Sequence, residues 1–165
     1  MTLQELMAGV TPSATFEGFS TADDMVFAVG FTEGVGVGDY LVAQVGVSEA
    51  SGKLSAQTQD SQYLRTGQVT TKTGTSRSFT VNGDRHCGDP FQDELLSHGI
   101  KYGTGQAVIK PYVYFNMLTG KGETGSISIA VENDLGGAAG DNASFTATLT
   151  STVKPVEYEY APGGP

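Results

Sequence analysis

Residues 143–152 read Ala-Ser-Phe-Thr-Ala-Thr-Leu-Thr-Ser-Thr, and this stretch decides the fold class. Phe145, Ala147 and Leu149 alternate with threonine at the intervening positions. An apolar residue at every second position places one face of a strand against a core and the other face toward solvent. The whole composition agrees, because the chain has 15 Val against 10 Leu and no Trp, and β-branched residues favour strands. The sequence therefore predicts a mainly β protein.

Other segments alternate in the same way or have the length and composition of strands. They are residues 25–31, 40–47, 77–81, 106–115 and 126–132. Glycine-rich loops are expected between them, at residues 32–39, 116–125 and 133–142, with a turn at Asn82-Gly83. Six to eight strands and one good helix are typical of an antiparallel sandwich or small barrel with a flanking helix, here in a single domain over residues 1–165.

The expected helix runs from Asp89 to His98. Asp89 is a good N-cap and Pro90 fits the first helical position. Asp93 and Glu94 fall in the first turn, near the positive end of the helix dipole. Gly99 and Gly103 are candidate stops. The predicted inward face consists of Phe91, Leu95, Leu96 and His98.

Both ends of the chain are predicted to be arms. Residues 1–10 begin with a capping box, since Thr2 can accept from the Glu5 amide and Glu5 can reach back. The apolar residues that follow share one helical face: Leu3, Leu6, Met7 and Val10. So short a helix must dock or remain a mobile arm. Residues 153–165 are expected to be irregular.

Residues 48–75 form the longest stretch without a clear pattern. The segment is polar, and its large apolar residues are only Leu54, Tyr63, Leu64 and Val69. A loop of this length is uncommon in a compact domain unless it is functional or bound by a partner. We therefore expect an excursion from the domain here.

Composition and charge exclude several classes of protein. Gly (23), Thr (19) and Ser (13) make up a third of the chain, so the core is thin. No apolar run reaches the length of a membrane helix, no signal peptide is expected, and one cysteine excludes a disulfide framework. The net charge is −9, which disfavours tight non-specific DNA binding.

The charge is unevenly distributed along the chain. Residues 1–52 carry −7, residues 53–85 carry +3 and residues 86–165 carry −5. Two interpretations remain open. The charges form an ordinary soluble surface, or the basic stretch of one copy meets an acidic segment of the next.

No catalytic, metal or cofactor site stands out. His86 and Cys87 are neighbours in sequence and would point apart in a strand, which disfavours a Cys–His nucleophile. Asp84, His86 and His98 have no known metal-ligand spacing. The Gly-Lys-Gly at residues 120–122 lacks the rest of a phosphate-binding loop and is better explained as a hairpin tip. We therefore expect neither an enzyme nor a cofactor.

Four segments carry a family resemblance by their order and spacing. They are GDPFQDELLSHGIKYGTG at residues 88–105, YVYF at 112–115, TGKGE at 119–123 and NASF at 142–145. Together they resemble the major tail (tail tube) proteins of long-tailed, non-contractile bacteriophages, over about residues 53–155. The first fifty residues match less specifically.

The resemblance implies a two-sheet antiparallel β-sandwich with a flanking helix on its outer side. It implies hexameric rings that stack into a tube, with one sheet of each subunit joined to its neighbours in a continuous inner β-barrel. In the family a long loop and terminal arms bridge the rings, and by resemblance residues 48–75 would be that inter-subunit loop and residues 1–10 and 153–165 the arms. Some relatives carry a further C-terminal domain.

The same resemblance implies the partners and the location. The chain would bind itself and other tail proteins, namely the tape measure, tail terminator and distal tail proteins. DNA would pass during ejection without specific binding, and no membrane would be involved. The protein would belong to the virion tail and be assembled in the cytoplasm of the bacterial host.

Two sets of residues are expected to act in such a tube. An acidic wall would repel DNA weakly and keep it mobile, and the candidate lumen acids are Asp23, Asp24, Glu33, Asp39, Glu132 and Asp134. These acids could equally lie outside or pair with bases of adjacent rings. The candidate inter-subunit contacts are Leu3, Leu6, Lys53, Tyr63, Leu64, Arg65, Lys72, Tyr158 and Tyr160.

Two alternative functions remain. The chain could be another phage structural protein, such as a head-completion or decoration protein. It could also be a carbohydrate-binding β-sandwich, although the lack of Trp and of an export signal disfavours that function.

Overall fold

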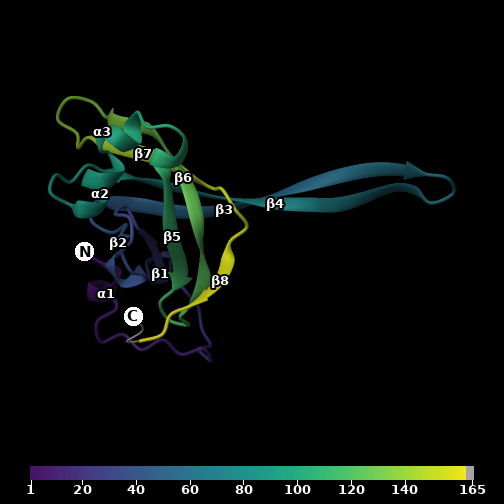
Figure 1. Cartoon of the computed structure of the whole chain (residues 1–165), viewed down its shortest axis with the longest axis horizontal. Helices are drawn as coiled ribbons and strands as arrows, with labels where there is room; N and C mark the ends of the chain where they lie inside the picture. The colour runs from purple at the N-terminus through teal and green to yellow at the C-terminus, as the bar shows by residue number, and fades with distance from the viewer. Residues whose placement is uncertain (163–165) are drawn as a thin grey trace.

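The computed structural model describes residues 1–162 and shows a β body with a long two-stranded projection (Figure 1). The strands are β1 Met25–Val29, β2 Leu41–Val42, β3 Val47–Tyr63, β4 Gly67–Asp84, β5 Ile109–Asn116, β6 Lys121–Gly136, β7 Ser144–Ser151 and β8 Val156–Glu159. The short helices are α1 Leu3–Leu6, α2 Pro90–Leu95 and α3 His98–Lys101, with 3-10 turns η1 Ala22–Asp24, η2 Val37–Asp39 and η3 Gly105–Val108. Every strand pairing is antiparallel, which confirms the predicted fold class.

The two layers of the sandwich are two halves of one curled sheet. The hydrogen-bonded order is β2-β1-β5-β6-β7-β4-β3, with β8 paired to β6. In a flat sheet, β1 and β4 would lie about 19 Å apart, four strand spacings of about 4.8 Å. Instead, the rings of Phe27 on β1 and Phe79 on β4 have centroids only 4.7 Å apart. The sheet therefore folds over, so that β2-β1-β5 faces β6-β7-β4-β3.

A first core fills the space between the two halves. Its strand residues alternate as the sequence predicts, and its largest buried side chains are aromatic: Phe27, Phe79, Tyr112 and Phe145. Helices α2 and α3 add Phe91, Leu95 and Ile100 to the same cluster. The helices thus flank the sandwich and close part of its core.

The predicted helix is confirmed at its start and differs at its end. The Asp89 carboxylate accepts from the Gln92 amide at 3.0 Å, and Pro90 stands in the first turn. The helix stops at Leu95, because Ser97 is extended and begins α3. This break turns His98 outward, so its predicted inward place was wrong and Ile100 takes the buried position.

A second core covers the other face of β1 and β5. Val26 and Ala28 point into it while their neighbours point into the first core. The predicted capping box forms, with the Thr2 amide donating to Glu5 Oε2 at 2.8 Å and the Glu5 amide to Thr2 Oγ1 at 3.3 Å. Helix α1 docks here through Leu3 and Met7. The N-terminal segment therefore packs on its own chain in this structure.

Residues 48–75 are an excursion, as expected, but not a loop. Apart from the turn at residues 64–66, they belong to the paired strands β3 and β4, which pair from Val47↔Gly83 to Tyr63↔Gly67 with a register shift between Gln57 and Thr58. The expected turn at Asn82-Gly83 is also wrong, since β4 continues to Asp84. A Cβ at Gly83 would lie 2.1 Å from the Gly46 carbonyl oxygen, so this glycine serves a close backbone approach. Periodicity missed the hairpin because polar side chains cover both of its faces.

The C-terminal segment is likewise more regular than expected. Residues 156–159 form β8, which pairs with β6 from Lys121↔Glu159 to Thr124↔Val156. The rings of Tyr158 and Tyr160 both lie 5.6 Å from that of Phe115. The predicted C-terminal arm is therefore tied to the body up to residue 160, and its last three residues lie outside the described part of the chain.

Candidate assembly surfaces

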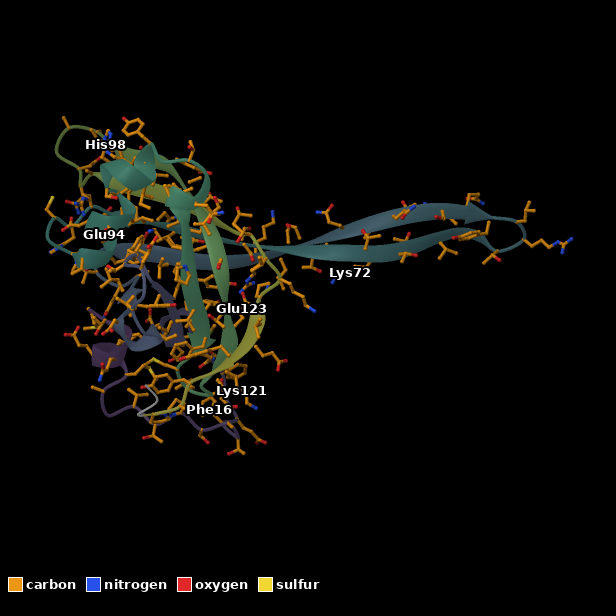
Figure 2. All side chains as sticks on the ribbon, in the orientation of Figure 1. Phe16, Lys72, Glu94, His98, Lys121 and Glu123 are labelled. Atoms are coloured by element: carbon orange, nitrogen blue, oxygen red, sulfur yellow. The ribbon has the colours of Figure 1, made fainter. Side chains whose placement is uncertain are left out.

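The arm, defined here as residues 54–76, is the most prominent feature of the molecule. It leaves the body as a two-stranded ribbon, and its polar side chains project into solvent on both sides (Figures 1 and 2). Ten residues of β3 at about 3.3 Å each give it a length of about 33 Å. No residue of the arm is buried. A ribbon of this kind is marginal alone and gains stability from a partner.

The tip of the arm combines an apolar, an aromatic and a basic side chain. Leu64 is 95% exposed and Tyr63 is 56% exposed. Arg65 has a φ of 65°, and no other non-glycine residue described has a positive φ. Backbone held in this region costs energy and concentrates at functional positions. The tip is therefore a candidate contact surface.

A partly buried charge cluster fixes the root of the arm. Arg77 Nε donates to Glu123 Oε1 at 2.7 Å, and Tyr112 Oη donates to the same oxygen at 3.1 Å. The Arg77 guanidinium also lies over the rings of Phe79 at 4.6 Å and Tyr114 at 5.1 Å. Burial, and then the Glu123 charge, raise the pKa of Tyr112. Sequence periodicity offered no signal for this cluster, which joins three strands.

The four strands β6-β7-β4-β3 end in two unpaired edges. Strand β3 pairs only with β4, and the backbone of β6 from Ile129 to Gly136 pairs only with β7 among residues 1–162. A groove of about 740 Å³ runs beside the β3 edge, between Ser48–Gly52 and Ser20–Asp23. Unpaired edges are templates for pairing with another chain. Each end of this half-sheet therefore presents unpaired backbone groups to which a strand of another chain can pair.

The outer face of the same four strands is rich in hydroxyl groups. At its centre, Ser78 and Thr80 of β4 lie opposite Thr150 and Thr148 of β7. Among residues 1–162 no helix lies over it, since α2 and α3 pack into the first core on the opposite face and α1 packs into the second core. Among the candidate lumen acids, Glu132 lies at this face, where it accepts from the Thr148 hydroxyl at 2.8 Å.

The other candidate acids are dispersed. Asp23 lines the groove beside β3, and Asp24 caps η1 by accepting from Thr21. Glu33 is exposed in the loop after β1, and Asp39 ends η2. Asp134 receives a hydrogen bond from Lys101 Nζ at 3.0 Å, and this ion pair lowers the pKa of the Asp134 carboxyl. The structure does not gather the six acids on one face.

The candidate contact residues divide into two groups. Five lie along the arm and its root and are exposed: Lys53, Tyr63, Leu64, Arg65 and Lys72. The other four belong to the second core or pack against it: Leu3, Leu6, Tyr158 and Tyr160. Leu3 is only 1% exposed in the single chain, so in this conformation it has almost no surface left for a neighbour.

A second groove, of about 310 Å³, opens between α1, η2 and β8. Val37, Tyr158 and Tyr160 supply its apolar wall. Asp39 and Glu159 lie at the same groove and are exposed, and neither is ion-paired within residues 1–162. Sequence reasoning placed these residues in three unrelated segments and could not bring them together.

The residues considered for chemistry remain apart. His86 and Cys87 are exposed in the turn after β4, and the His98 ring lies 4.8 Å from that of Tyr102. Residues 1–162 contain no group of three His, Cys, Asp or Glu side chains placed to hold a metal ion. No helix in the same range has the length and apolarity needed to cross a membrane.

Comparison with known sequences gives one distant match. No protein-family model matches the chain. The structural polyprotein of Cricket paralysis virus (isolate Teleogryllus commodus/Australia/CrPVVIC/1968) is 28% identical over 102 residues, which cover 62% of this chain. The match spans only 11% of that polyprotein.

Solved structures share the fold over most of the chain. The tail of an empty gene transfer agent (GTA) particle, with C6 symmetry, superposes with a TM-score of 0.60 at 15% identity, covering 87% of this chain and 100% of that one. The virion of the native GTA particle gives 0.55 at 14% identity, with coverages of 87% and 100%. The sheath-tube complex of an extracellular contractile injection system gives 0.52 at 12% identity, with coverages of 89% and 95%. The chain therefore has a tail-tube-like fold, which these neighbours do not restrict to non-contractile tails.

Proposed function

We propose that this chain is a structural protein of a virion tail, which polymerises into stacked rings that form a tube. The half-sheet β6-β7-β4-β3 carries the proposal, because β3 is open at one end and β6 is open from Ile129 to Gly136 at the other. Successive strands alternate in direction, so β3 runs antiparallel to β6. The β3 edge of one copy can therefore pair with the β6 edge of the next without interrupting the antiparallel order.

Such pairing is head-to-tail, and it closes into a ring when the rotation per copy is right. Six copies would supply about 24 strands, and barrels of about 16–18 strands already enclose an aqueous channel. The C6 symmetry of the GTA tail that shares this fold supports a hexamer. Closure removes the open edges of this half-sheet, and exposed strand edges are otherwise sites of unwanted pairing.

The uncovered hydroxyl face would then line the channel. The second layer of each subunit occupies the opposite face, and its bulk fits only outside the ring. The wall would consist mainly of Ser and Thr, with Glu132 as the candidate acid that lies on it. A weakly charged wall would let DNA pass during ejection without holding it, because tight binding of DNA phosphates requires basic side chains. Of the six candidate acids, Glu132 alone is proposed to line the channel, and β3 adds Glu49, which accepts from Asn82 Nδ2 at 3.2 Å, and Lys53, which lies opposite Ser78.

The proposed role places the protein in the tail of a long-tailed phage particle, assembled in the host cytoplasm. Its partners would be copies of itself and the tape measure, tail terminator and distal tail proteins. The fold shared with GTA and injection-system particles supports this role. No enzymatic step or cofactor is required.

Electron microscopy of the purified protein, with and without other tail proteins, tests the proposal. Rings or hollow tubes are expected. The double variant Ser51→Lys/Ala130→Lys places a cation near each open edge and should abolish rings, because edge lysines oppose strand pairing. Thr146→Lys/Thr150→Lys is the matched control, since it adds the same two charges on the interior strand β7. A strict monomer at high concentration, even with tail proteins added, would overturn the proposal.

A further inference from the structure

A lysine and a glutamate lie at the two open edges of the half-sheet, on its hydroxyl face. Residues that pair across the four strands form rows, and one row consists of Lys53 on β3, Ser78 on β4, Thr150 on β7 and Ser128 on β6. Glu132 lies further along β6, at an irregularity between Val131 and Asn133. Lys53 and Glu132 are both exposed, and neither is ion-paired within residues 1–162. Each charge is thus available to a neighbouring copy.

We propose that Lys53 of one copy pairs with Glu132 of the next copy in the same ring. This inference rests on the proposed function and adds the register in which two copies join. A row that leaves one copy at Lys53 would enter β6 of its neighbour about four residues beyond Ser128, at the irregularity that contains Glu132. The size and the direction of this shift follow from separate observations.

The tilt of strands in a barrel sets the size of the shift. Barrel strands tilt by about 35–45° from the axis, so four strands about 4.8 Å apart advance a row by about 13–19 Å along the strands. That distance is about four to six residues, and the number must be even to keep the hydroxyl face continuous. A shift of about six residues would bring Lys53 beside Gly136, which carries no charge. A shift of about four brings it to Glu132 and Asn133, and the opposite charges select this register.

The open part of β6 sets the direction of the shift. Ser128 already pairs with Ile109 of β5, so the β3 edge of a neighbour can pair only with the stretch from Ile129 to Gly136. An unshifted row would place Lys53 at Ser128, where this backbone edge is occupied. A shift toward lower numbers would meet the part of β6 that pairs with both β5 and β8. The row must therefore enter β6 beyond Ser128.

The handedness of the sheet requires the same direction. The Asp84 amide donates to the Gly46 carbonyl, toward β3, and the Arg85 amide donates to the Ala143 carbonyl, toward β7. Asp84 shares the hydroxyl face with Thr80 by alternation, so for L-residues β3 lies to the right of an upward-running β4 in a view of that face. The right-handed twist of strands makes rows climb to the right when a barrel is viewed from its channel. Since β6 runs parallel to β4, the climb leads toward its higher residue numbers.

The pair would act on both the junction and the channel wall. Opposite charges that face one another across two strands favour a single register, because a slip of the strands separates them. Each pair would also cancel the charge of Glu132 on the wall and leave Glu49 as an acid without a cation there. The same register places Leu135, which is 74% exposed, beside Gly52 at the groove along the β3 edge.

Charge reversal tests the pair. Lys53→Glu brings two glutamates together at every junction and should lower the yield of rings at least about tenfold by sedimentation, because like charges oppose cross-strand pairing. Adding Glu132→Lys to the same chain restores opposite charges and should restore the rings. Lys72→Glu is the matched control, because it makes the same charge change on the arm, away from both edges of the body, and should leave the ring yield unchanged.

The outcomes separate the register from the function on which it rests. Lys53→Glu rings at the wild-type yield would overturn the pair and leave ring formation standing. Rings that are lost in Lys53→Glu and not regained with Glu132→Lys would contradict the pair as well. If the wild-type chain formed no rings with tail proteins present, the proposed function and the register would fail together.

Disulfide cross-linking reads the register directly. In a Cys87→Ser background, rings of the Lys53→Cys/Glu132→Cys chain should oxidise to a ladder of linked copies, since facing positions lie within disulfide reach. Within one chain the two strands lie about 14 Å apart, so each link must join two copies. The matched control, Lys53→Cys/Ser128→Cys, tests the unshifted register and should give no ladder. A control ladder of equal or greater strength, or intact rings without a ladder from either chain, would overturn the proposal.

Discussion

Strands β3 and β4 contribute to both the arm and the body, and the two regions are held by different forces. In the body, Phe79 and Val81 of β4 lie in the first core with exposures of 2% and 0%. In the arm, the same strand carries Thr, Lys and Gln on both faces and is held by hydrogen bonds to β3, from the backbone and from side chains such as Thr70, whose hydroxyl donates to Asp60 at 2.6 Å. The comparison shows that one strand can be fixed by packing at one end and lack packing against its own chain at the other.

The largest expected effect contrasts one residue from each region. Phe145→Ala, in the first core, should lower the free energy of unfolding by about 3–5 kcal/mol, because it leaves a cavity among buried side chains. Leu64→Ala, at the arm tip, should change it by less than about 0.5 kcal/mol, because the side chain has no contacts to lose in the single chain. Denaturant unfolding of the monomer measures both.

The contrast between a packed body and an unpacked arm would be wrong if Leu64→Ala destabilised the monomer as much as Phe145→Ala does. That result would mean that the arm folds back on the body in solution. A neutral Leu64→Ala that also weakens tube assembly would sharpen the contrast, because the same side chain would then matter only between copies.

Much of the body was predictable from sequence, although the strand expected at residues 40–47 is only β2 at Leu41–Val42, and the arm was predictable only as an excursion. Alternation identified β1 and β7 almost to the residue, because one face of each strand is apolar. The capping box at Thr2 and the N-cap at Asp89 were found because each requires only local spacing. Strand β3 was missed because its residues in the arm are polar on both faces of the ribbon. No periodicity therefore distinguishes them from a loop.

The candidate surfaces were less predictable than the fold. The arm tip was found because Tyr63, Leu64 and Arg65 stand out in a polar segment. The open edges and the groove could not be found, because they depend on which strands remain unpaired and on contacts among residues 3–4, 36–39 and 158–161. No local pattern in any single segment of the sequence indicates long-range pairing of this kind.

The next largest effect concerns the arm root, where the two regions meet. Glu123→Gln removes the charge that faces Arg77, whose side chain is 11% exposed. Leaving a buried guanidinium without its carboxylate should cost about 2–4 kcal/mol of unfolding free energy. Hydrogen exchange should show faster exchange at the root than in β7, since the root then loses part of its packing.

Asp134→Asn is the matched control for that variant, because it removes the carboxylate of an exposed pair with Lys101. Surface pairs contribute about 1 kcal/mol or less, so this change should be small. Equal losses of unfolding free energy in the two variants would show that the Arg77–Glu123 pair stabilises the protein no more than a surface pair. The pair would then not fix the direction of the arm.

The smallest effect is a pH dependence at the same root. Burial raises the pKa of Tyr112 above its ordinary value of 10.0, and the Glu123 charge adds to the shift. The unfolded chain therefore loses this phenolic proton before the folded chain does, so it binds fewer protons and stability falls as the pH rises above about 10. The contribution is fully present below pH 10 and should decline by up to about 1 kcal/mol by pH 11.

Tyr112→Phe cannot ionise, so its Tm should fall less than that of the wild type between pH 9 and 11. Burial also raises the pKa of Tyr40 and Tyr158, so some decline should persist. Tyr63→Phe, at the arm tip, is the control and should follow the wild-type profile. A Tyr112→Phe profile that coincides with the wild type would mean that the root hydroxyl is hydrated in solution, and the boundary between packed body and exposed arm would then lie deeper in the molecule.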